Sequence, residues 1–578
     1  MDDRLRERLG LAAAGGAHGL AIWLLVEAWP ESPAARAAAV SLLTFLAVTA
    51  LVFHFAWTGR ARGRLLAVTL GTGLLYAAVA GWVGASLPGE TLASRADEGR
   101  AWTWLAASLV TLYVLGPFLQ IHQRTGKIHF PYRDLFLHGW NNFFVALVGG
   151  LFVNALWAVL LLWAALFELV GIDFFKEFFR EPAFVWPVTA AAAGFGIALG
   201  RESERVVSTL RKVTLALFRG LLPLVAFVAL IFLAALPFTG LDALWSTNHA
   251  SQLLLTWVAL TVLFLNAVYQ DGSGEETPSR PVRWLVEAAL LAMTAYVVIS
   301  VHGISLRIEQ YGLTPRRFWI VLSAVVLGSY AFGYAFAVVR RGRPWLRAVR
   351  AVNLLVALLV VALGLLAHTP LLDPIGWSAR SQIARLADGR VAAADFDYGF
   401  LHFQLGREGE AGLGELEALA DHPEIATIRD GVAKARAAES YWAWQQRHGP
   451  AFGEDLFHVL PPGSELPEGL LDAARADSPI AVNGACADAR YCAAFAVELD
   501  GRAPPEWVLA VIRYNWTQLY VLARRETGFE YLGQLEHGSR PPKPAEIEAS
   551  LEALEYRAAD PVVRDLLIGE TRYRLVPR

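Results

Sequence analysis

Two histidines, His18 and His54, lie inside long apolar stretches of this 578-residue chain. An imidazole in such a setting can relay a proton or bind a polar substrate, because its charge changes near neutral pH. A neutral histidine bonded to a main-chain carbonyl is the alternative. Asn142, Asn154 and Asn266 complete a candidate polar membrane site. Amides at membrane depth more often hydrogen-bond across helices than bind a substrate.

A second candidate surface is the charged connection around Arg307, Glu309, Arg316 and Arg317, which separates two apolar stretches. Arginines here can hold an anionic headgroup or dock a carboxylate of the C-terminal region. We favour docking, because the segment is unusually polar for a connection on the side that is otherwise poor in positive charge.

Both cysteines of the chain, Cys486 and Cys492, fall in the polar C-terminal part. Their short spacer can close a disulfide loop, and such a bond persists in an oxidising compartment. Two unpaired thiols are the alternative, because two cysteines specify a bond only weakly.

Motifs that would name a reaction are absent from the sequence. No GxSxG elbow, P-loop, HExxH or CxxC occurs, so we expect no catalytic residue and no cofactor. His122, His129 and His138 share a loop, but their spacings fit no common metal-ligand pattern, and we expect no metal site. The net charge of -3 argues against nucleic acid as a partner.

The composition indicates a membrane protein. Hydrophobic residues make up 55% of the chain, charged residues only 18%, and the mean hydropathy is +0.41. A helix needs about 20 mostly apolar residues to cross a bilayer. Eleven stretches qualify, and the backbone must be helical in lipid. They are Leu9–Trp29, Ala37–Trp57, Leu65–Leu87, Trp102–Ile121, Phe144–Leu166, Phe184–Leu199, Leu221–Phe238, Leu253–Val268, Trp284–Ile304, Phe318–Val339 and Val349–Leu366.

The orientation follows from the connections between these spans. The N-terminus and every second connection carry most of the lysines and arginines, which favours a cytoplasmic location for them. An odd number of spans then places the C-terminal part outside, in the periplasm of a cell with two membranes. Phe184–Leu199 is short and contains Pro187. If it does not fully span the membrane, the number of spans becomes even and the C-terminal part lies on the cytoplasmic side.

Residues 1–370 therefore form a polytopic α-helical membrane bundle, and residues 371–578 form a soluble α+β domain. Helical periodicity dominates the first part of this domain. Alternating segments then predict an antiparallel meander of four strands. These segments are Ala493–Leu499, Trp507–Arg513, Thr517–Ala523 and Phe529–Leu535.

Several segments resemble a bacterial membrane family known as domain of unknown function 4153. They include the WNN of Trp140–Asn142, the GRE of Gly200–Glu202, the LNAVYQDG of Leu265–Gly272, the LRIEQYGLTPRR of Leu306–Arg317 and the long ARLADGRVAAADFDYGFLHFQLG of Ala384–Gly406. The resemblance runs from about Asp134 to about Leu419. It implies a multi-spanning inner-membrane protein and assigns no functional residue.

Three functions remain open at this stage. We favour a non-enzymatic inner-membrane protein whose bundle anchors an exported domain for envelope sensing, assembly or binding of an envelope protein. The alternative is a transporter or lipid-handling protein with a polar cavity near His18, His54 and the asparagines. A membrane-embedded transferase would need a charged pocket at one membrane face, for example with Glu168 or Arg307. Apart from the lipid bilayer, the partner and the oligomeric state are undetermined.

Overall fold

The computed structural model describes residues 3–30, 32–59, 61–87, 95–241, 250–270, 272, 278–340, 345–441, 444–445, 457–477, 486, 491–499, 503–512, 517–525, 528–535, 543–558, 566–568 and 571–573. The chain forms two compact units. We call Met1–Arg390 with Leu405–Gly414 the helical unit, and Val391–Gln404 with Glu415–Arg578 the C-terminal unit.

Eleven helices of the described chain are long and apolar enough to cross a membrane, as predicted. The stretch around Pro187, whose length raised the question of parity, forms a helix of 21 residues. The short helix α6 (Phe174–Phe178) precedes it. The eleven are α1 (Asp3–Glu27), α2 (Pro33–Ala56), α3 (Arg62–Ala85), α4 (Arg95–Thr125), α5 (Tyr132–Glu168), α7 (Pro182–Glu202), α8 (Glu204–Thr239), α10 (Ala250–Tyr269), α11 (Arg280–Tyr311), α12 (Pro315–Val339) and α13 (Val349–Leu366).

Several of these helices extend beyond the apolar windows of the sequence. Helix α5 begins at Tyr132 instead of Phe144, and α8 begins at Glu204 instead of Leu221. A hydropathy window detects only the part that suits hydrocarbon, whereas main-chain hydrogen bonds continue the helix into polar sequence. The extensions carry polar side chains at the ends of the spans.

Glycines let α1 and α7 pack closely. A Cβ at Gly15 would lie 2.4 Å from the carbonyl oxygen of Ala190, and one at Gly19 would lie 2.5 Å from that of Trp186. On the next face of α7, Gly196 packs against Gly149 of α5, where a Cβ would lie 2.9 Å away. Small residues drive helix association in membranes because they allow backbones to approach.

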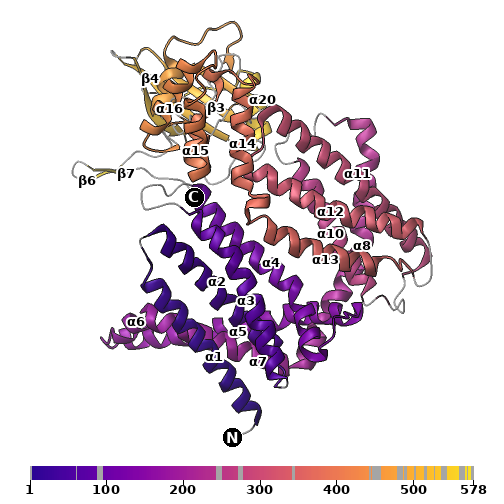
Figure 1. Cartoon of the computed structure of the whole chain (residues 1–578). Helices are drawn as coiled ribbons and strands as arrows, with labels where there is room; N and C mark the ends of the chain where they lie inside the picture. Colours follow the sequence, from indigo (N-terminus) through magenta and orange to yellow (C-terminus); the bar gives the residue numbers. More distant parts are fainter. Residues whose placement is uncertain are drawn as a thin grey trace. The chain divides into compact units, whose positions relative to one another are not determined.

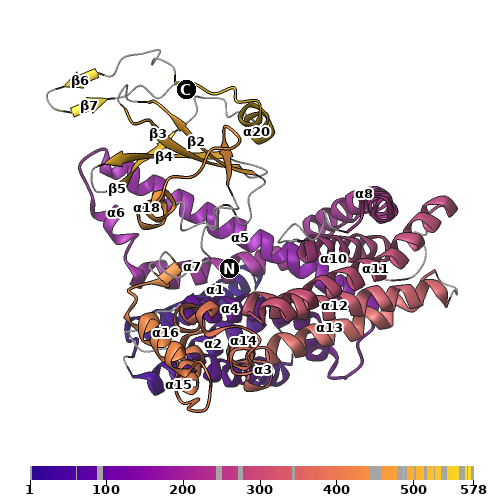
Figure 2. The ribbon, with the colours of Figure 1, turned by 90° about the horizontal axis from the view of Figure 1, so that it is seen from above.

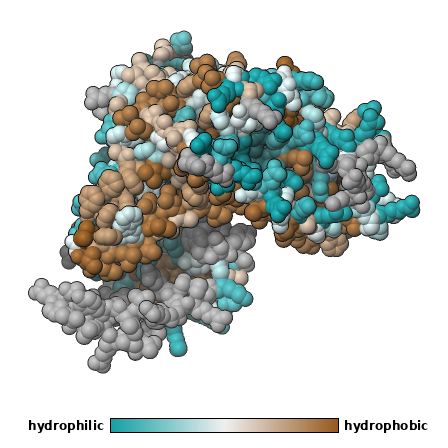
Figure 3. Space-filling view, turned by 90° about the horizontal axis from the view of Figure 1, so that it is seen from below, coloured by the Kyte–Doolittle hydropathy of each residue, from teal (hydrophilic) through white to brown (hydrophobic). Residues whose placement is uncertain are grey.

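A second group of helices, α8 and α10–α13, packs together (Figure 1) and contributes most of the residues of a large buried apolar cluster. Its fully buried members include Leu265, Leu290 and Met293. Many other apolar side chains on the spans are exposed, such as Leu151, Val159 and Leu162 of α5. Broad hydrophobic areas cover parts of the molecular surface in Figure 3, beside an area where hydrophilic side chains gather. Exposed apolar surface of this extent is what a lipid-facing bundle requires.

The chain continues past the last span as η1 (Pro370–Leu372), α14 (Pro374–Ala387) and α15 (Gly406–Glu417). Asp373 starts α14, because its carboxylate accepts a hydrogen bond from the Ile375 amide at 3.1 Å and proline follows at the first helical position. Helix α14 and the start of α15 belong to the helical unit.

The C-terminal unit contains a mixed five-stranded sheet in the order β1-β2-β3-β4-β5 (Figure 2). The four predicted strands are β2 (Tyr491–Val497), β3 (Glu506–Ile512), β4 (Thr517–Arg525) and β5 (Gly528–Leu535), and they pair antiparallel as predicted. The remaining strand, β1 (His458–Leu460), pairs parallel with β2. Strand β1 was not predicted, because three residues are too few to show the alternation of apolar and polar side chains.

Both faces of this sheet are covered. Leu509 and Val511 pack with α18 (Leu470–Asp477), whereas Val508 and Ala510 lie on the face that contains Leu551 of α20 (Pro544–Glu552). The unit also contains η2 (Ala393–Asp395), η3 (Phe400–Gln404), α16 (Ile425–Ala437) and the paired strands β6 (Leu566–Ile568) and β7 (Thr571–Tyr573). The fold class predicted from the sequence, a membrane bundle followed by an α+β region, is confirmed.

The long segment that carries the family resemblance has a structural role in this unit. Asp397 accepts hydrogen bonds from Tyr441 at 3.1 Å, Trp444 at 2.8 Å and Gln445 at 3.2 Å. At Gly399 an added Cβ would lie 2.1 Å from the Trp444 ring. The carboxylate and the glycine therefore fix one helical segment against another.

Candidate functional site

Six helix ends converge on a cavity of about 1150 Å³ in the helical unit. They are the C-terminal ends of α2, α4 and α7 and the N-terminal ends of α3, α5 and α8. Helices that alternate in direction bring these ends to one side. We call this the basic cavity, and its polar lining consists of Thr58, Arg64, Gln120, Gln123, Arg124, His138, Asn141, Asn142, Arg201, Glu204, Ser208 and Arg211.

Local sequence signals end the helices at this cavity. Gly126 follows α4 with a φ of +71°, and its amide donates to the carbonyl of His122 at 2.7 Å, which closes the last turn. Pro131 precedes α5, and Ser203 alone separates α7 from α8. These short breaks hold polar residues at the membrane edge.

The lining of the basic cavity is positively charged, with four arginines against one glutamate. Arg64 donates to the carbonyl of Arg124 at 3.4 Å, and Arg201 donates to the carbonyl of His54 at 3.0 Å. Arg211 donates to the side-chain oxygen of Asn141. In the described part of the chain, none of the four arginines forms an ion pair with a carboxylate.

Two carboxylates near Arg201, those of Glu7 and Glu202, act on it electrostatically but form their hydrogen bonds with other residues. Glu202 pairs with Arg8 of α1, and Glu7 accepts a hydrogen bond from the Trp57 indole at 2.6 Å. Arg64, Arg201 and Arg211 thus donate their hydrogen bonds to neutral acceptors.

Neutral amides line the cavity beside the arginines. Gln120 and Asn142 exchange hydrogen bonds at 2.9 and 3.1 Å, and Gln120 also donates to the carbonyl of Phe55 at 3.0 Å. Gln123 is fully buried and donates to Thr58 at 3.0 Å. These contacts fix α2, α4 and α5 to one another where the cavity meets the apolar interior.

The predicted polar membrane residues are distributed over several hydrogen-bond groups. His18 and His54 are neighbours, with ring centroids 6.4 Å apart. His18 bonds the carbonyl of Ala14, whereas buried His54 lies within hydrogen-bond distance of the carbonyls of Ala50 at 2.6 Å and Leu11 at 3.0 Å. His54 thereby joins α1 to α2, which is a packing role.

The predicted asparagines lie in three different places. Asn142 lines the basic cavity, whereas Asn154 donates to the carbonyl of Gly150 in its own helix. Asn266 belongs to a polar network that links α5, α10, α12 and α13. In it Asn266 donates to Tyr334 at 2.9 Å, and Asn353 donates to Tyr132 at 2.7 Å.

The predicted docking surface contacts α14. Arg385 donates to the carbonyls of Glu309 at 2.9 Å and Gln310 at 2.6 Å, and Gln382 donates to those of Tyr311 and Leu313. The last carbonyls of a helix lack partners within it and carry partial negative charge. An arginine of α14 therefore caps α11.

The arginines predicted for this surface have neutral partners. Arg317 donates to the carbonyl of Tyr311 at 3.2 Å, and Arg307 lies over the Tyr311 ring at 5.9 Å. Arg316 lies next to the side-chain amide of Gln252.

Sequence reasoning missed a buried charge cluster around Arg100. Its guanidinium lies 3.3 Å from Asp373 and 3.3 Å from Glu408, and the three side chains are 6%, 12% and 17% exposed. The partners are too distant in sequence for any spacing signal. Arg100 precedes the fourth apolar stretch, in one of the connections that carry few lysines and arginines. Its unusual position was the only sequence signal for a buried charge cluster.

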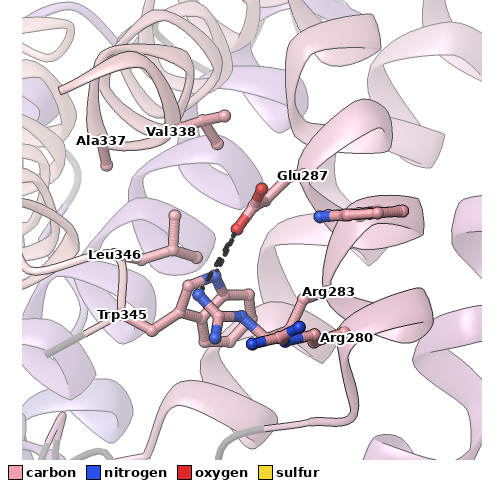
Figure 4. Close-up of a pocket in the computed structure, with 8 residues that line it drawn as sticks. Arg280, Arg283, Glu287, Ala337, Val338, Trp345 and Leu346 are labelled. Atoms are coloured by element: carbon pink, nitrogen blue, oxygen red, sulfur yellow. Dashed lines mark hydrogen bonds and ion pairs between the residues drawn. The ribbon is translucent and has the colours of Figure 1, made fainter. Parts of the chain in front are cut away.

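A second cavity of about 540 Å³ lies between the start of α11 and the end of α12 (Figure 4). Glu287 accepts a hydrogen bond from the Trp345 indole at 2.7 Å, and Arg283 lies 4.0 Å from Glu287 and 5.5 Å from the Trp345 ring. Arg283 and Glu287 form the pair expected from their spacing of one helical turn. This cavity therefore contains an arginine with a carboxylate partner, in contrast to the arginines of the basic cavity.

In the C-terminal unit, Cys486 and Cys492 form a disulfide whose two residues belong to the apolar cluster on one face of the sheet. The bond therefore ties residue 486 to strand β2. Among the described residues, no group of three histidine, cysteine, aspartate or glutamate side chains could hold a metal ion.

Eleven spanning helices and an appended α+β region define a multi-pass membrane protein. The chain belongs to the family described as "Domain of unknown function (DUF4153)", which matches residues 19–416. The matched region begins at residue 19, well before the resemblance noted from about Asp134, and it ends at residue 416, close to Leu419. No curated protein and no solved structure matches the chain.

Two of the segments that carry the family resemblance line the basic cavity. Asn141 and Asn142 come from the WNN segment, and Gly200 and Arg201 come from the GRE segment. The arginines of this region recur at the connections on one side of the bundle, a pattern that also sets the predicted orientation. The same recurrence is the sequence signal that could have indicated a shared site.

Proposed function

We propose that this protein binds a phosphate-class anion in the basic cavity, at the cytoplasmic face of the bacterial inner membrane. The N-terminus and the basic cavity then lie on the cytoplasmic side, and residues 371–578 lie in the periplasm. The excess of lysine and arginine at one set of helix ends supports this orientation. The proposal develops the lipid-handling alternative of the sequence analysis.

The observation that carries the proposal is a cavity lined by four arginines, three of which (Arg64, Arg201 and Arg211) donate hydrogen bonds to neutral oxygens. Like charges around one cavity repel, and an anion would relieve that repulsion. The planar guanidinium presents paired donors that match phosphate oxygens. Arg201 and Arg211 are only partly exposed, so their charge is less screened than that of a surface arginine.

The test uses the full chain in phosphatidylcholine nanodiscs. Two phosphate probes are offered, dissolved glycerol 3-phosphate by calorimetry and phosphatidylglycerol by native mass spectrometry. Arg201→Gln with Arg211→Gln is expected to weaken binding by about tenfold for each lost charge-assisted contact.

The matched control is Arg205→Gln with Lys212→Gln, which removes the same charge from exposed positions of α8 outside the cavity. Its affinity is expected to stay within about twofold of the parent, because exposed charges act weakly at a distance. If neither probe binds, or if the control loses as much affinity as the cavity variant, the proposal is overturned.

A second function, presentation of a periplasmic domain to an envelope protein, has one specific observation in its favour. Cys486 and Cys492 lie in disulfide geometry within the C-terminal unit, and structural disulfides persist in oxidising compartments. Alkaline phosphatase fused after Arg578 should be active in cells, and green fluorescent protein fused there should be dark. The reverse pattern would remove this function.

A further inference from the structure

An apolar pocket of about 270 Å³ adjoins the basic cavity. It lies between α2, α4 and α5, and its apolar lining includes Leu51, Leu109, Leu112, Phe143 and Ala146. Every residue that lines it belongs to a candidate membrane span. We call it the apolar pocket.

The two spaces share part of their lining. Phe55, Ala56, Gln120 and Asn142 line both the basic cavity and the apolar pocket. The hydrogen-bonded pair of Gln120 and Asn142 lies where arginine-rich lining changes to leucine-rich lining. One molecule could therefore contact both spaces, with a polar group at the junction.

The apolar pocket also reaches the lipid-facing surface. Leu109, Phe143 and Leu51 at its rim are 53%, 49% and 37% exposed. Exposed apolar side chains within a span face hydrocarbon in a bilayer. A molecule with a hydrocarbon chain can enter this pocket from the membrane. A dissolved anion would gain no favourable contact with its apolar lining.

We infer that the ligand of the basic cavity is an anionic, phosphate-bearing lipid whose hydrocarbon chain occupies the apolar pocket. This inference rests on the proposed function and adds the class of ligand. The arginines contact the phosphate, and the amides of Gln120 and Asn142 lie level with the polar junction between headgroup and chain. The leucines and Phe143 contact the chain.

The experiment uses phosphatidylglycerol with a photoactivatable diazirine in its acyl chain, present as a trace in phosphatidylcholine nanodiscs that contain the full chain. Mass spectrometry should locate the adducts on the residues of α2, α4 and α5 that line the apolar pocket. A phosphatidylcholine probe with the same diazirine is the lipid control. It should label these residues at least about fivefold less, because it carries no net charge for the arginines to attract.

The variant Ala146→Phe fills the apolar pocket, and Ala155→Phe places the same side chain at an exposed position of α5 outside it. Ala146→Phe should reduce labelling by about tenfold, because the chain loses its space. Ala155→Phe should leave labelling unchanged. In the parent protein, unlabelled phosphatidylglycerol should also reduce binding of glycerol 3-phosphate, a measurement that needs no variant.

Three results would overturn the inference while the proposed function stands. The first is arginine-dependent binding of glycerol 3-phosphate that phosphatidylglycerol does not reduce. The second is labelling by phosphatidylglycerol that Ala146→Phe leaves unchanged, and the third is equal labelling by both lipid probes. If neither phosphate probe shows binding that depends on Arg201 and Arg211, both proposals are overturned.

Discussion

Arginines occupy two very different settings in the helical unit. Arg100 is buried and paired with two carboxylates, Asp373 and Glu408. The arginines of the basic cavity, such as Arg201 and Arg211, have neutral partners beside open space. The contrast shows that the partner, and not the arginine, decides whether a charged position is structural or available to a ligand. An arginine paired with carboxylates holds helices together, whereas an arginine with neutral partners beside a cavity is the kind of group that we propose binds an anion.

The largest effect is expected from Arg100→Met. This change leaves Asp373 buried without its cation and leaves Glu408, among the described residues, with only Arg407, which lies 3.5 Å away. Loss of one partner in a buried ion pair costs about 3–5 kcal/mol. The thermal unfolding temperature of the protein in nanodiscs should fall accordingly. Arg390→Met removes an arginine from an exposed pair with Asp388 and should cost at most about 1 kcal/mol. Equal effects of the two substitutions would show that the buried Arg100 pairs contribute no more to stability than an exposed pair.

A partly buried polar group without charge should give an intermediate effect. Asn353→Leu removes the amide that bonds Tyr132 at 2.7 Å and also contacts Asn266. Hydrogen bonds between membrane helices contribute about 0.6 kcal/mol on average and rarely more than about 1.7 kcal/mol. Thermal unfolding should therefore show a smaller loss for Asn353→Leu than for Arg100→Met. The reverse order would show that charge pairing contributes less than this network.

The cluster around Arg100 should also make stability depend on pH. His368 lies just beyond α13 between Trp104 and Trp319, and burial lowers its pKa from the ordinary value. Arg100 lowers the pKa further, whereas the Gly364 carbonyl and Asp373 oppose this shift.

Because the unfolded chain binds a proton more readily at this histidine, its contribution to stability is complete above the unfolded pKa of about 6.5. The contribution declines as the pH falls below that value. Unfolding temperatures measured between pH 7.5 and pH 5 should fall less steeply for His368→Gln than for the parent. Parallel curves would contradict the assignment.

The smallest change in stability is expected at the basic cavity. Arg201→Gln with Arg211→Gln, measured without added anion, should alter the free energy of unfolding by no more than about 0.5 kcal/mol. Glutamine can still donate to neutral acceptors, and removal of two like charges relieves repulsion. A loss as large as that of Arg100→Met would mean that these arginines are structural.

The eleven spans and the four-stranded meander could be predicted because each depends on a short sequence period. Hydropathy located the apolar core of α5 but placed its start twelve residues late, so Asn141 and Asn142 fell outside the predicted span. The basic cavity depends on these extensions. Its arginines come from connections far apart in the sequence, and no local pattern joins Arg64 to Arg211.

A membrane bundle with an α+β region could be read from the order of residues alone, because lipid requires long apolar helices and a half-buried strand requires alternating side chains. The charged residues that contact one another become known only once the helices are packed. Arg100 contacts two carboxylates and Arg201 contacts a carbonyl, because helix packing brings together residues that are far apart in the sequence. The chemistry of the bundle therefore depends on which helix ends converge.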